Sequence, residues 1–255
     1  MIAAIIPARF SSTRFPGKPL ALIEGKTMIR RVYEQAVQSQ LIDEVVVATD
    51  DQRIVDEVRS FGGHVQLTRA DHPSGTDRCF EAVQLLDKSY DYVINIQGDE
   101  PFLDPRQIDE LAQYLKQHPV EIATQMIEVA SEAELVDPGE VKIVLNDRHE
   151  ALYFSRQPIP YLQGGNPGNW HQQHTYYRQV GMYAYRRDIL AKITQLPVSS
   201  LERAESLEQL RWLQAGYRIA CVPTRYVSYC IDHPDDISRV LTLLAQQPGA
   251  VVRKK

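Results

Sequence analysis

The sequence predicts a doubly wound α/β fold with a mostly parallel sheet, and two observations lead to that class. Its apolar runs are short and rich in β-branched residues, as in Glu44–Thr49 (EVVVAT). In the first half, each such run is followed by a longer segment with helical periodicity. Strands buried on both faces form continuous apolar runs, and their alternation with helices is typical of parallel sheets.

The first half is expected to contain four strands, each followed by a helix. The expected strands are Ile2–Ile6, Glu44–Thr49, Val65–Leu67 and Tyr92–Gln97. The expected helices are Met28–Gln40, Asp51–Phe61 with Asp50 as its N-cap, a helix from Ser74-Gly75-Thr76 to about Leu86, and one from about Pro105 to Gln117.

The second half is less regular. Strands are expected at Ile122–Ile127, Val141–Leu145, Ala151–Phe154, Val180–Tyr185 and Arg218–Pro223. Helices are expected at Leu201–Ala215 and Pro234–Gln247, and the Pro/Gly-rich stretch Gln163–Gly168 is expected to be a loop. Because nothing resembles a flexible linker, we expect one domain over residues 1–255 with an excursion within about 125–200.

Composition excludes several classes of protein. The 255 residues include 28 Lys+Arg and 33 Asp+Glu, a net charge of −5, with 44% apolar residues, which argues against disordered and fibrous chains. No apolar run approaches the roughly 18 residues of a membrane span. Non-specific nucleic-acid binding needs a basic face, so neither a nucleic acid nor a membrane is an expected partner, although a local basic site is allowed.

Cysteine usage and the N-terminus predict a cytoplasmic protein. Cys79, Cys221 and Cys230 form no CxxC pair and no zinc-type spacing, which indicates reduced thiols. The opening MIAAIIPAR has no basic residue before its apolar stretch, which Pro7 and Arg9 cut short. It therefore indicates a buried first strand rather than a signal peptide.

The loop after the first strand is a candidate phosphate site. It contains three cations, Arg9, Arg14 and Lys18, together with hydroxyl residues at 11–13. Open α/β sheets bind ligands at the carboxyl ends of their strands, and arginine can contact phosphate oxygens through two nitrogens at once. The alternative is a solvated surface loop.

Two carboxylates are candidate metal ligands. Asp99 follows the strand Tyr92–Gln97, and Asp232 lies just before the last helix. Carboxylates from separate loops can share a magnesium ion, which prefers hard oxygen ligands. Taken singly, Asp232 could be only a helix N-cap and Asp99 only a turn residue.

Seven motifs in one order give the sequence a resemblance to a known family. They are PARFSSTRFPGKPL at 7–20, VATDD at 47–51, TRADHPSGTDR at 68–78, INIQGDEP at 94–101, ALYFSRQPIP at 151–160, LEQLR at 207–211 and IDHPDDI at 231–237. Together they resemble the sugar-activating cytidylyltransferases, and most closely the 3-deoxy-manno-octulosonate (Kdo) cytidylyltransferase family.

The resemblance implies a fold, a reaction and partners. The fold is a single α/β nucleotide-binding domain of the nucleotide-diphospho-sugar transferase type, usually a homodimer formed through a projecting segment. The anomeric hydroxyl of Kdo would attack the α-phosphorus of CTP, releasing pyrophosphate and giving CMP-Kdo for lipopolysaccharide core synthesis. Mg²⁺ is the implied cofactor. A cytidylyltransferase for a related acidic sugar and a non-catalytic nucleotide-binding module are the alternatives.

The resemblance also assigns residues to roles. The catalytic residues are Arg9, Lys18, Asp99 and Asp232, and the metal ligands are Asp99 and Asp232. The nucleotide would contact Pro7, Ala8, Arg9, Ser11, Arg14, Lys18, Ser74, Gly75 and Arg78. The sugar would contact Arg78, Gln97, Arg156, Gln179, Tyr183, Glu208 and Gln209. Arg156 suits the sugar carboxylate, because a guanidinium can bind it through two nitrogens.

Gln179 departs from the resemblance. Relatives usually have histidine at this position, whereas glutamine forms hydrogen bonds but carries no charge. A related acidic sugar therefore remains possible as the substrate.

Overall fold

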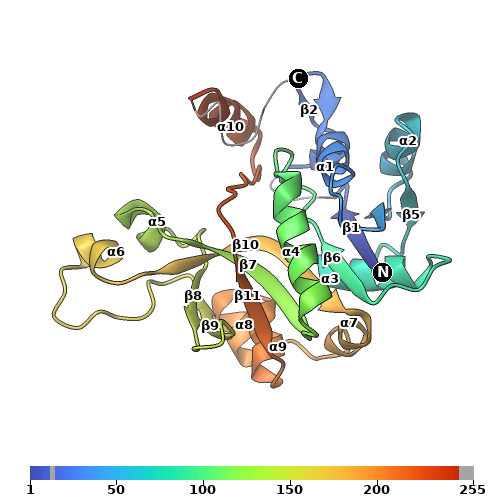
Figure 1. Cartoon of the computed structure of the whole chain (residues 1–255). Helices are drawn as coiled ribbons and strands as arrows, with labels where there is room; N and C mark the ends of the chain where they lie inside the picture. The colour runs from blue at the N-terminus through green and yellow to red at the C-terminus, as the bar shows by residue number, and fades with distance from the viewer. Residues whose placement is uncertain (12–14, 247–255) are drawn as a thin grey trace. The chain divides into compact units, whose positions relative to one another are not determined.

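The structure, a computed structural model, describes residues 1–11 and 15–246 (Figure 1). The predicted phosphate ligand Arg14 and the hydroxyl residues Ser12 and Thr13 lie outside the described residues. The chain divides into two compact units, Met1–Gln113 with Tyr226–Lys255, and Tyr114–Arg225. Each unit is described by itself below. No helix in the described ranges is long and apolar enough to cross a membrane.

The first unit is built on parallel strands in the order β6-β1-β4-β5. These strands are β1 (Ile2–Ala8), β4 (Glu44–Thr49), β5 (Val65–Leu67) and β6 (Tyr92–Asn95). In β1, all residues from Ile2 to Ile6 are buried. A strand with neighbours on both sides and helices over its faces has no solvent-facing side, which explains its continuous apolar run.

The helices of the first unit largely confirm the predictions. They are α1 (Met28–Ala36), α2 (Gln52–Ser60), α3 (Gly75–Gln84), α4 (Pro105–Gln117), which continues into the second unit, and α10 (Pro234–Gln246). The predicted extension of α1 to Gln40 is wrong. The carboxylate of Asp109 accepts the N–H groups of Gln40 and Leu41, at 2.9 and 3.1 Å, so this segment leaves the helix.

The predicted cap of α2 is wrong by one residue. Asp51 is the N-cap, because its carboxylate accepts the backbone N–H of Arg53 at 3.0 Å. Asp50 instead lies 3.1 Å from the guanidinium of Arg78. Both residues are aspartates, so local sequence preference could not distinguish them.

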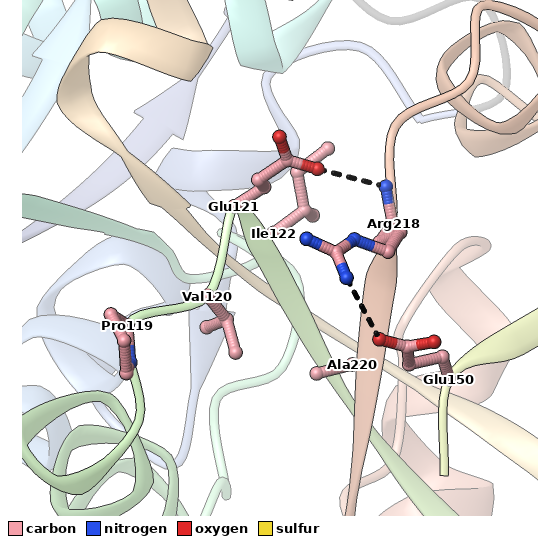
Figure 2. Close-up of a pocket in the computed structure, with 7 residues that line it drawn as sticks. All are labelled: Pro119, Val120, Glu121, Ile122, Glu150, Arg218 and Ala220. Carbon is pink, nitrogen blue, oxygen red and sulfur yellow. Dashed lines mark hydrogen bonds and ion pairs between the residues drawn. The ribbon is translucent and has the colours of Figure 1, made fainter. Parts of the chain in front are cut away.

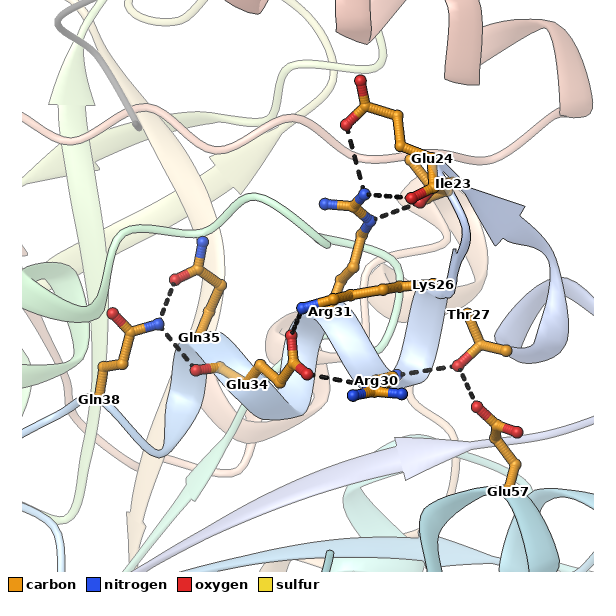
Figure 3. A network of polar contacts seen from close by, with 10 residues as sticks. All are labelled: Ile23, Glu24, Lys26, Thr27, Arg30, Arg31, Glu34, Gln35, Gln38 and Glu57. Atoms are coloured by element: carbon orange, nitrogen blue, oxygen red, sulfur yellow. Dashed lines mark hydrogen bonds and ion pairs between the residues drawn. The ribbon is translucent and has the colours of Figure 1, made fainter. Parts of the chain in front are cut away.

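A two-stranded hairpin, β2 (Leu22–Ile23) with β3 (Lys26–Thr27), precedes α1 and was not predicted. Figure 3 shows the polar contacts that hold it. The Thr27 hydroxyl caps α1 and donates to the Glu57 carboxylate at 2.8 Å, while Arg31 donates to the Ile23 carbonyl at 2.8 Å. Strands this short carry no periodicity that a sequence could reveal.

The second unit is mixed. Strand β7 (Ile122–Glu128) pairs in parallel with β11 (Ile219–Pro223) and antiparallel with β10 (Tyr177–Arg186), which is bulged between Val180 and Tyr183. Strand β8 (Lys142–Leu145) pairs antiparallel with β10 and with β9 (Ala151–Ser155). These antiparallel strands account for the irregular excursion in the sequence, and the predicted mostly parallel α/β class is confirmed.

The helices of the second unit differ more from the predictions. They are α5 (Glu132–Val136), α6 (Trp170–Gln173), α7 (Arg187–Ile193), α8 (Ser200–Glu205) and α9 (Gln209–Gln214). The predicted single helix Leu201–Ala215 is wrong, because Ser206 adopts a left-handed conformation with φ +53° between α8 and α9. A 3-10 turn at Pro167–Asn169 lies at the end of the predicted loop. The first unit has a 3-10 turn at Lys18–Leu20.

Candidate functional site

A cavity of about 440 Å³ lies at the carboxyl ends of β1 and β6, within the first unit. Its lining includes eight of the predicted site residues, Pro7, Ala8, Arg9, Ser11, Lys18, Gly75, Gln97 and Asp99, together with Pro19 and Gly98. Parallel strands end at one edge of their sheet, which brings these distant segments together. The volume is within the range of small-molecule sites.

Glycine at position 98 lets the two walls of this cavity approach each other. A β-carbon at Gly98 would lie 2.9 Å from the carbonyl oxygen of Pro7. Since real β-carbons essentially never approach backbone oxygen so closely, only glycine fits here without moving the backbone. Asp99 is the next residue, so this close contact fixes the backbone position from which the Asp99 side chain extends.

Backbone geometry holds Phe10 and Gly17 together. Gly17 has φ +71°, which glycine adopts readily, and its N–H donates to the Phe10 carbonyl at 2.9 Å. The Arg53 guanidinium lies 3.3 Å from the centre of the Phe10 ring. These contacts place Lys18 at the start of the 3-10 turn, with its side chain towards the acidic residues.

Lys18 joins the two predicted metal ligands. Its ammonium donates to Asp99 Oδ2 at 2.7 Å and to Asp232 Oδ1 at 3.1 Å, and only 15% of its side chain is exposed. Desolvation by itself would lower the pKa of Lys18, but the charges and hydrogen bonds of Asp99 and Asp232 outweigh it and raise the pKa. Lys18 is therefore a cation held between two carboxylates.

The segment that carries Asp232 is fixed on both sides. The N–H of Ile231 donates to the Asp99 carbonyl at 2.9 Å, and the buried Ile231 side chain packs in a cluster that includes Ile23 and Val240. The Asp236 carboxylate accepts the N–H of Asp232 at 3.0 Å. Asp236 thus satisfies the backbone at the start of α10, and the Asp232 carboxylate faces Lys18 instead.

The donor set suits a divalent cation. Oxygen atoms of Asp99 and Asp232 and the sulfur of Cys230 all lie within 4.8 Å of one another. Two carboxylates from separate loops are the kind of ligands that magnesium takes from proteins, with the remaining positions left to water and phosphates. Cys230 was not predicted as a site residue, although its position two residues before Asp232 was a signal.

The SGTDR segment forms the start of α3. Ser74 is the N-cap, with its hydroxyl accepting the N–H of Asp77 at 3.2 Å, and Gly75 lies at the cavity. Arg78 is fully buried and is not among the residues that line the cavity. Its guanidinium donates to Thr68 at 2.7 Å and lies beside Asp50. In this structure Arg78 therefore ties α3 to the ends of β4 and β5.

Three predicted sugar residues lie together in the second unit. The Gln209 amide donates to the Gln179 side-chain oxygen at 2.8 Å. Burial raises the pKa of the nearby Tyr183 well above its usual value. The Tyr183 ring contacts Trp212 edge-on, with the ring centres 5.2 Å apart. Glu208 directly precedes Gln209, and its carboxylate lies 3.9 Å from Arg211.

The guanidinium of Arg156 forms hydrogen bonds to backbone carbonyls in this structure. It donates to the carbonyls of Glu205 and Pro138, each at 2.8 Å, and to that of Ser206 at 3.3 Å. The carbonyls of Glu205 and Ser206 lie at the end of α8, where cations are favourable. A guanidinium has five N–H donors, so these three contacts leave it further capacity for a carboxylate.

Comparison with known sequences assigns the chain to a protein family. The sequence model of a family described as cytidylyltransferase matches residues 3–219. A 3-deoxy-manno-octulosonate cytidylyltransferase of Cytophaga hutchinsonii is 55% identical over 240 residues, which are 94% of this chain and 96% of that protein. Another protein of that name, from Parabacteroides distasonis, is 49% identical over 247 residues, 95% of this chain and 98% of its own length.

Solved structures agree with the sequence comparisons. CMP:2-keto-3-deoxy-manno-octonic acid synthetase, complexed with CTP, is similar with a TM-score of 0.88 and 44% identity over 96% of this chain and 99% of that chain. A 4-diphosphocytidyl-2C-methyl-D-erythritol synthase from Anaerococcus prevotii has a TM-score of 0.61 at 15% identity over 96% of this chain and 98% of that chain, which shows a shared fold.

The chain is therefore a member of the cytidylyltransferases, a class of nucleotidyl-transferring enzymes. Within that class it belongs to the 3-deoxy-manno-octulosonate cytidylyltransferase family.

Proposed function

We propose that this protein transfers CMP from CTP to the anomeric hydroxyl of Kdo, with release of pyrophosphate. The observation that carries the proposal is the cavity at β1 and β6, where Lys18 bridges Asp99 and Asp232 in a chain 55% identical to a Kdo cytidylyltransferase. The product serves lipopolysaccharide core synthesis.

The cavity residues bind the triphosphate and organise its charge. Arg9 and Lys18 contact phosphate oxygens, and Ser11 adds a hydroxyl donor. Because charge develops on the α-phosphate and on the leaving pyrophosphate, fixed cations at these positions stabilise the transition state. Pro7, Ala8, Gly75 and the cap residue Ser74 shape the wall that receives the nucleotide. Arg14, which lies outside the described residues, is proposed as a further phosphate ligand.

Asp99 and Asp232 would hold the Mg²⁺ cofactor, which would supply positive charge at the phosphates and make the attacking hydroxyl more acidic. Lys18 neutralises part of the charge on the same carboxylates, which keeps the pair in place. No histidine is needed as a dedicated base.

The sugar is bound through hydrogen bonds and one guanidinium. Arg156 receives the carboxylate, and Tyr183, Glu208, Gln209 and Gln179 contact the hydroxyl groups. Gln179 supports a second candidate substrate, a related acidic sugar, because a neutral amide stands where relatives usually carry histidine.

The protein is further proposed to act in the cytoplasm as a homodimer. As one domain over residues 1–255, it would use the excursion within about 125–200 for dimerisation. Size-exclusion chromatography with light scattering tests the dimer, because a mass near 58 kDa is expected from two chains of 29.1 kDa each.

Pyrophosphate release from CTP with magnesium tests the activity itself. The assay is run with Kdo, with other acidic sugars and without sugar. Release that depends on Kdo supports the proposal, and preference for another acidic sugar supports the second candidate. CTP binding without release from any sugar would make the protein a nucleotide-binding module and contradict the proposal.

A further inference from the structure

Cys230 places a sulfur atom beside the two carboxylates of the first unit. The three ligand atoms, from Asp99, Cys230 and Asp232, lie within 4.8 Å of one another, a grouping that could hold one metal ion. All three cysteines of the chain lie in the described ranges. Cys79 and Cys221 are buried, whereas Cys230 is exposed and can be reached by an ion from solvent.

This ligand set is fixed in place rather than carried on a loose loop. Ile231, between Cys230 and Asp232, is fully buried, and its N–H is bonded to the carbonyl of Asp99 at 2.9 Å. The Asp236 carboxylate holds the N–H groups of Asp232 and His233, at 3.0 and 2.9 Å. The backbone therefore keeps the sulfur and both carboxylates together before any ion binds.

The three donors favour a different cation from magnesium. Magnesium takes hard oxygen ligands, whereas thiolate sulfur selects zinc and similar cations. Three protein ligands with an open fourth position are a common arrangement for zinc in proteins. Lys18 contacts Asp99 through Oδ2 and Asp232 through Oδ1, so an ion at this site shares both carboxylates with the ammonium.

We propose that Asp99, Cys230 and Asp232 form a binding site for a thiophilic divalent cation of the zinc class, in competition with magnesium. The proposal rests on the proposed role of the two carboxylates as metal ligands. When the ion binds, the Cys230 thiol gives its proton to solvent and a sulfur–metal bond forms, with no change of oxidation state. The ion then occupies the carboxylates without any nucleotide.

Spectroscopic titration tests the site independently of enzyme activity. Cd²⁺ or Co²⁺ is added to the full chain without CTP, and the absorption that arises from charge transfer between thiolate and metal is recorded. One ion per chain is expected to produce the band, and excess Mg²⁺ is expected to reduce it. Absence of the band in the wild-type protein would overturn the proposal.

Variants assign the band to its ligands. Cys230→Ser is expected to remove it and to weaken Cd²⁺ binding by about 100-fold or more, since even indirect ligand partners are worth 10–100-fold. Asp99→Asn and Asp232→Asn are expected to weaken binding while keeping a sulfur signal. Cys79 and Cys221 remain in Cys230→Ser, so a band that persists there belongs to them and contradicts the site. If Asp99→Asn and Asp232→Asn both left the Cd²⁺ affinity unchanged, that result would also contradict the proposed site.

The test separates this proposal from the proposed function. Kdo-dependent pyrophosphate release without a thiolate band would leave the function intact and reject the cation site. A thiolate band that responds to Asp99→Asn and Asp232→Asn, in a protein without that activity, would support the site and reject the function.

Discussion

Gln209 donates a hydrogen bond from its side-chain amide to the side-chain oxygen of Gln179, at 2.8 Å. Gln209 is buried, so its amide depends on this partner. The contact joins α9 to β10 and orients the Gln179 side chain, whose own amide nitrogen lies 3.5 Å from the Thr124 hydroxyl. Position 179, where the family resemblance implies histidine, is thus part of an ordered amide pair.

Replacing Gln179 with histidine is expected to raise affinity for Kdo. A hydrogen bond from a neutral group contributes about 0.5–1.5 kcal/mol, and one from a charged group about twice that. A gain of about 1.4 kcal/mol corresponds to tenfold in binding. Steady-state measurements should show a lower KM for Kdo and an unchanged KM for CTP. Gln195→His, at an exposed position of the same unit, is the control.

A change confined to the CTP parameters would show that position 179 does not face the sugar. Unchanged parameters for both substrates would show that glutamine already makes the contact that histidine makes in relatives.

Removing either acidic partner of Lys18 is expected to abolish most of the activity. Asp99→Asn and Asp232→Asn keep the side-chain size but replace a carboxylate by an amide that binds magnesium poorly. Turnover at limiting magnesium should fall by about two orders of magnitude or more, while circular dichroism shows a folded chain. Asp235→Asn, an exposed position in the first turn of α10, is the matched control. Near-normal turnover in a folded Asp232→Asn protein would reject the shared metal.

The cations of the first loop are expected to act on the nucleotide. Arg9→Ala and Lys18→Ala should raise the KM for CTP much more than the KM for the sugar, because both side chains line the cavity proposed to bind the triphosphate. The expected increase is about tenfold or more for each, from the loss of a charge-assisted contact worth about 1.5–3 kcal/mol. Lys26→Ala, at an exposed lysine of the hairpin, is the control. CTP binding unchanged in both loop variants would assign this loop another role.

Arg156→Ala is expected to affect both substrate use and stability. Loss of a carboxylate ligand should raise the KM for Kdo, with little effect on CTP. Loss of three hydrogen bonds to carbonyls should also lower the free energy of unfolding by about 1–3 kcal/mol. Urea titration and kinetics measure the two effects separately. A variant that is destabilised with an unchanged sugar KM would make Arg156 a purely structural residue.

Asp236 is expected to make the free energy of unfolding depend on pH below about pH 4. Burial alone would raise its pKa, but hydrogen bonds from Arg239, His233 and Asp232 lower it to about 2. A folded pKa below the unfolded value means that the stabilisation is present above about pH 4 and is lost as the pH falls towards 2. The contribution is about 2 kcal/mol. Urea titrations between pH 5 and 2.5 should therefore show a flatter profile in Asp236→Asn than in the wild type, and parallel profiles would contradict the assignment.

The sequence predicted the first unit well because its strands are continuous apolar runs and its site follows them directly. Lys18, Asp99 and the cavity could be anticipated from where the strands end. The pairing of Lys18 with Asp232 could not, because it joins residues more than 200 positions apart. The break at Ser206 was missed because the segment Leu201–Ala215 keeps a helical period through a residue that adopts φ +53°.

Arg78 and Cys230 both have partners that no local pattern reveals. Arg78 was predicted as a nucleotide and sugar ligand, and in the structure its guanidinium is buried beside Thr68 and Asp50. A single cysteine outside a CxxC pair indicates only a reduced thiol, so the one signal at Cys230 was its position two residues before Asp232. Its significance depends on the carboxylate of Asp99, which the fold brings beside it.

Pro7 has glycines opposite it on two segments, and this limits how the chain can change over generations. A β-carbon at Gly98 would lie 2.9 Å from the Pro7 carbonyl, and one at Gly75 would lie 3.3 Å from the Pro7 ring. At Gly164, by contrast, no atom lies within 4 Å, so added bulk meets only the strain of its positive φ. In a saturation library, almost every substitution at position 98 should therefore be lost, whereas position 164 should accept those residues that tolerate a left-handed backbone. In related sequences, exposed positions such as Gly164 can therefore vary, whereas the close contacts of Pro7 with Gly75 and Gly98 should stay nearly unchanged.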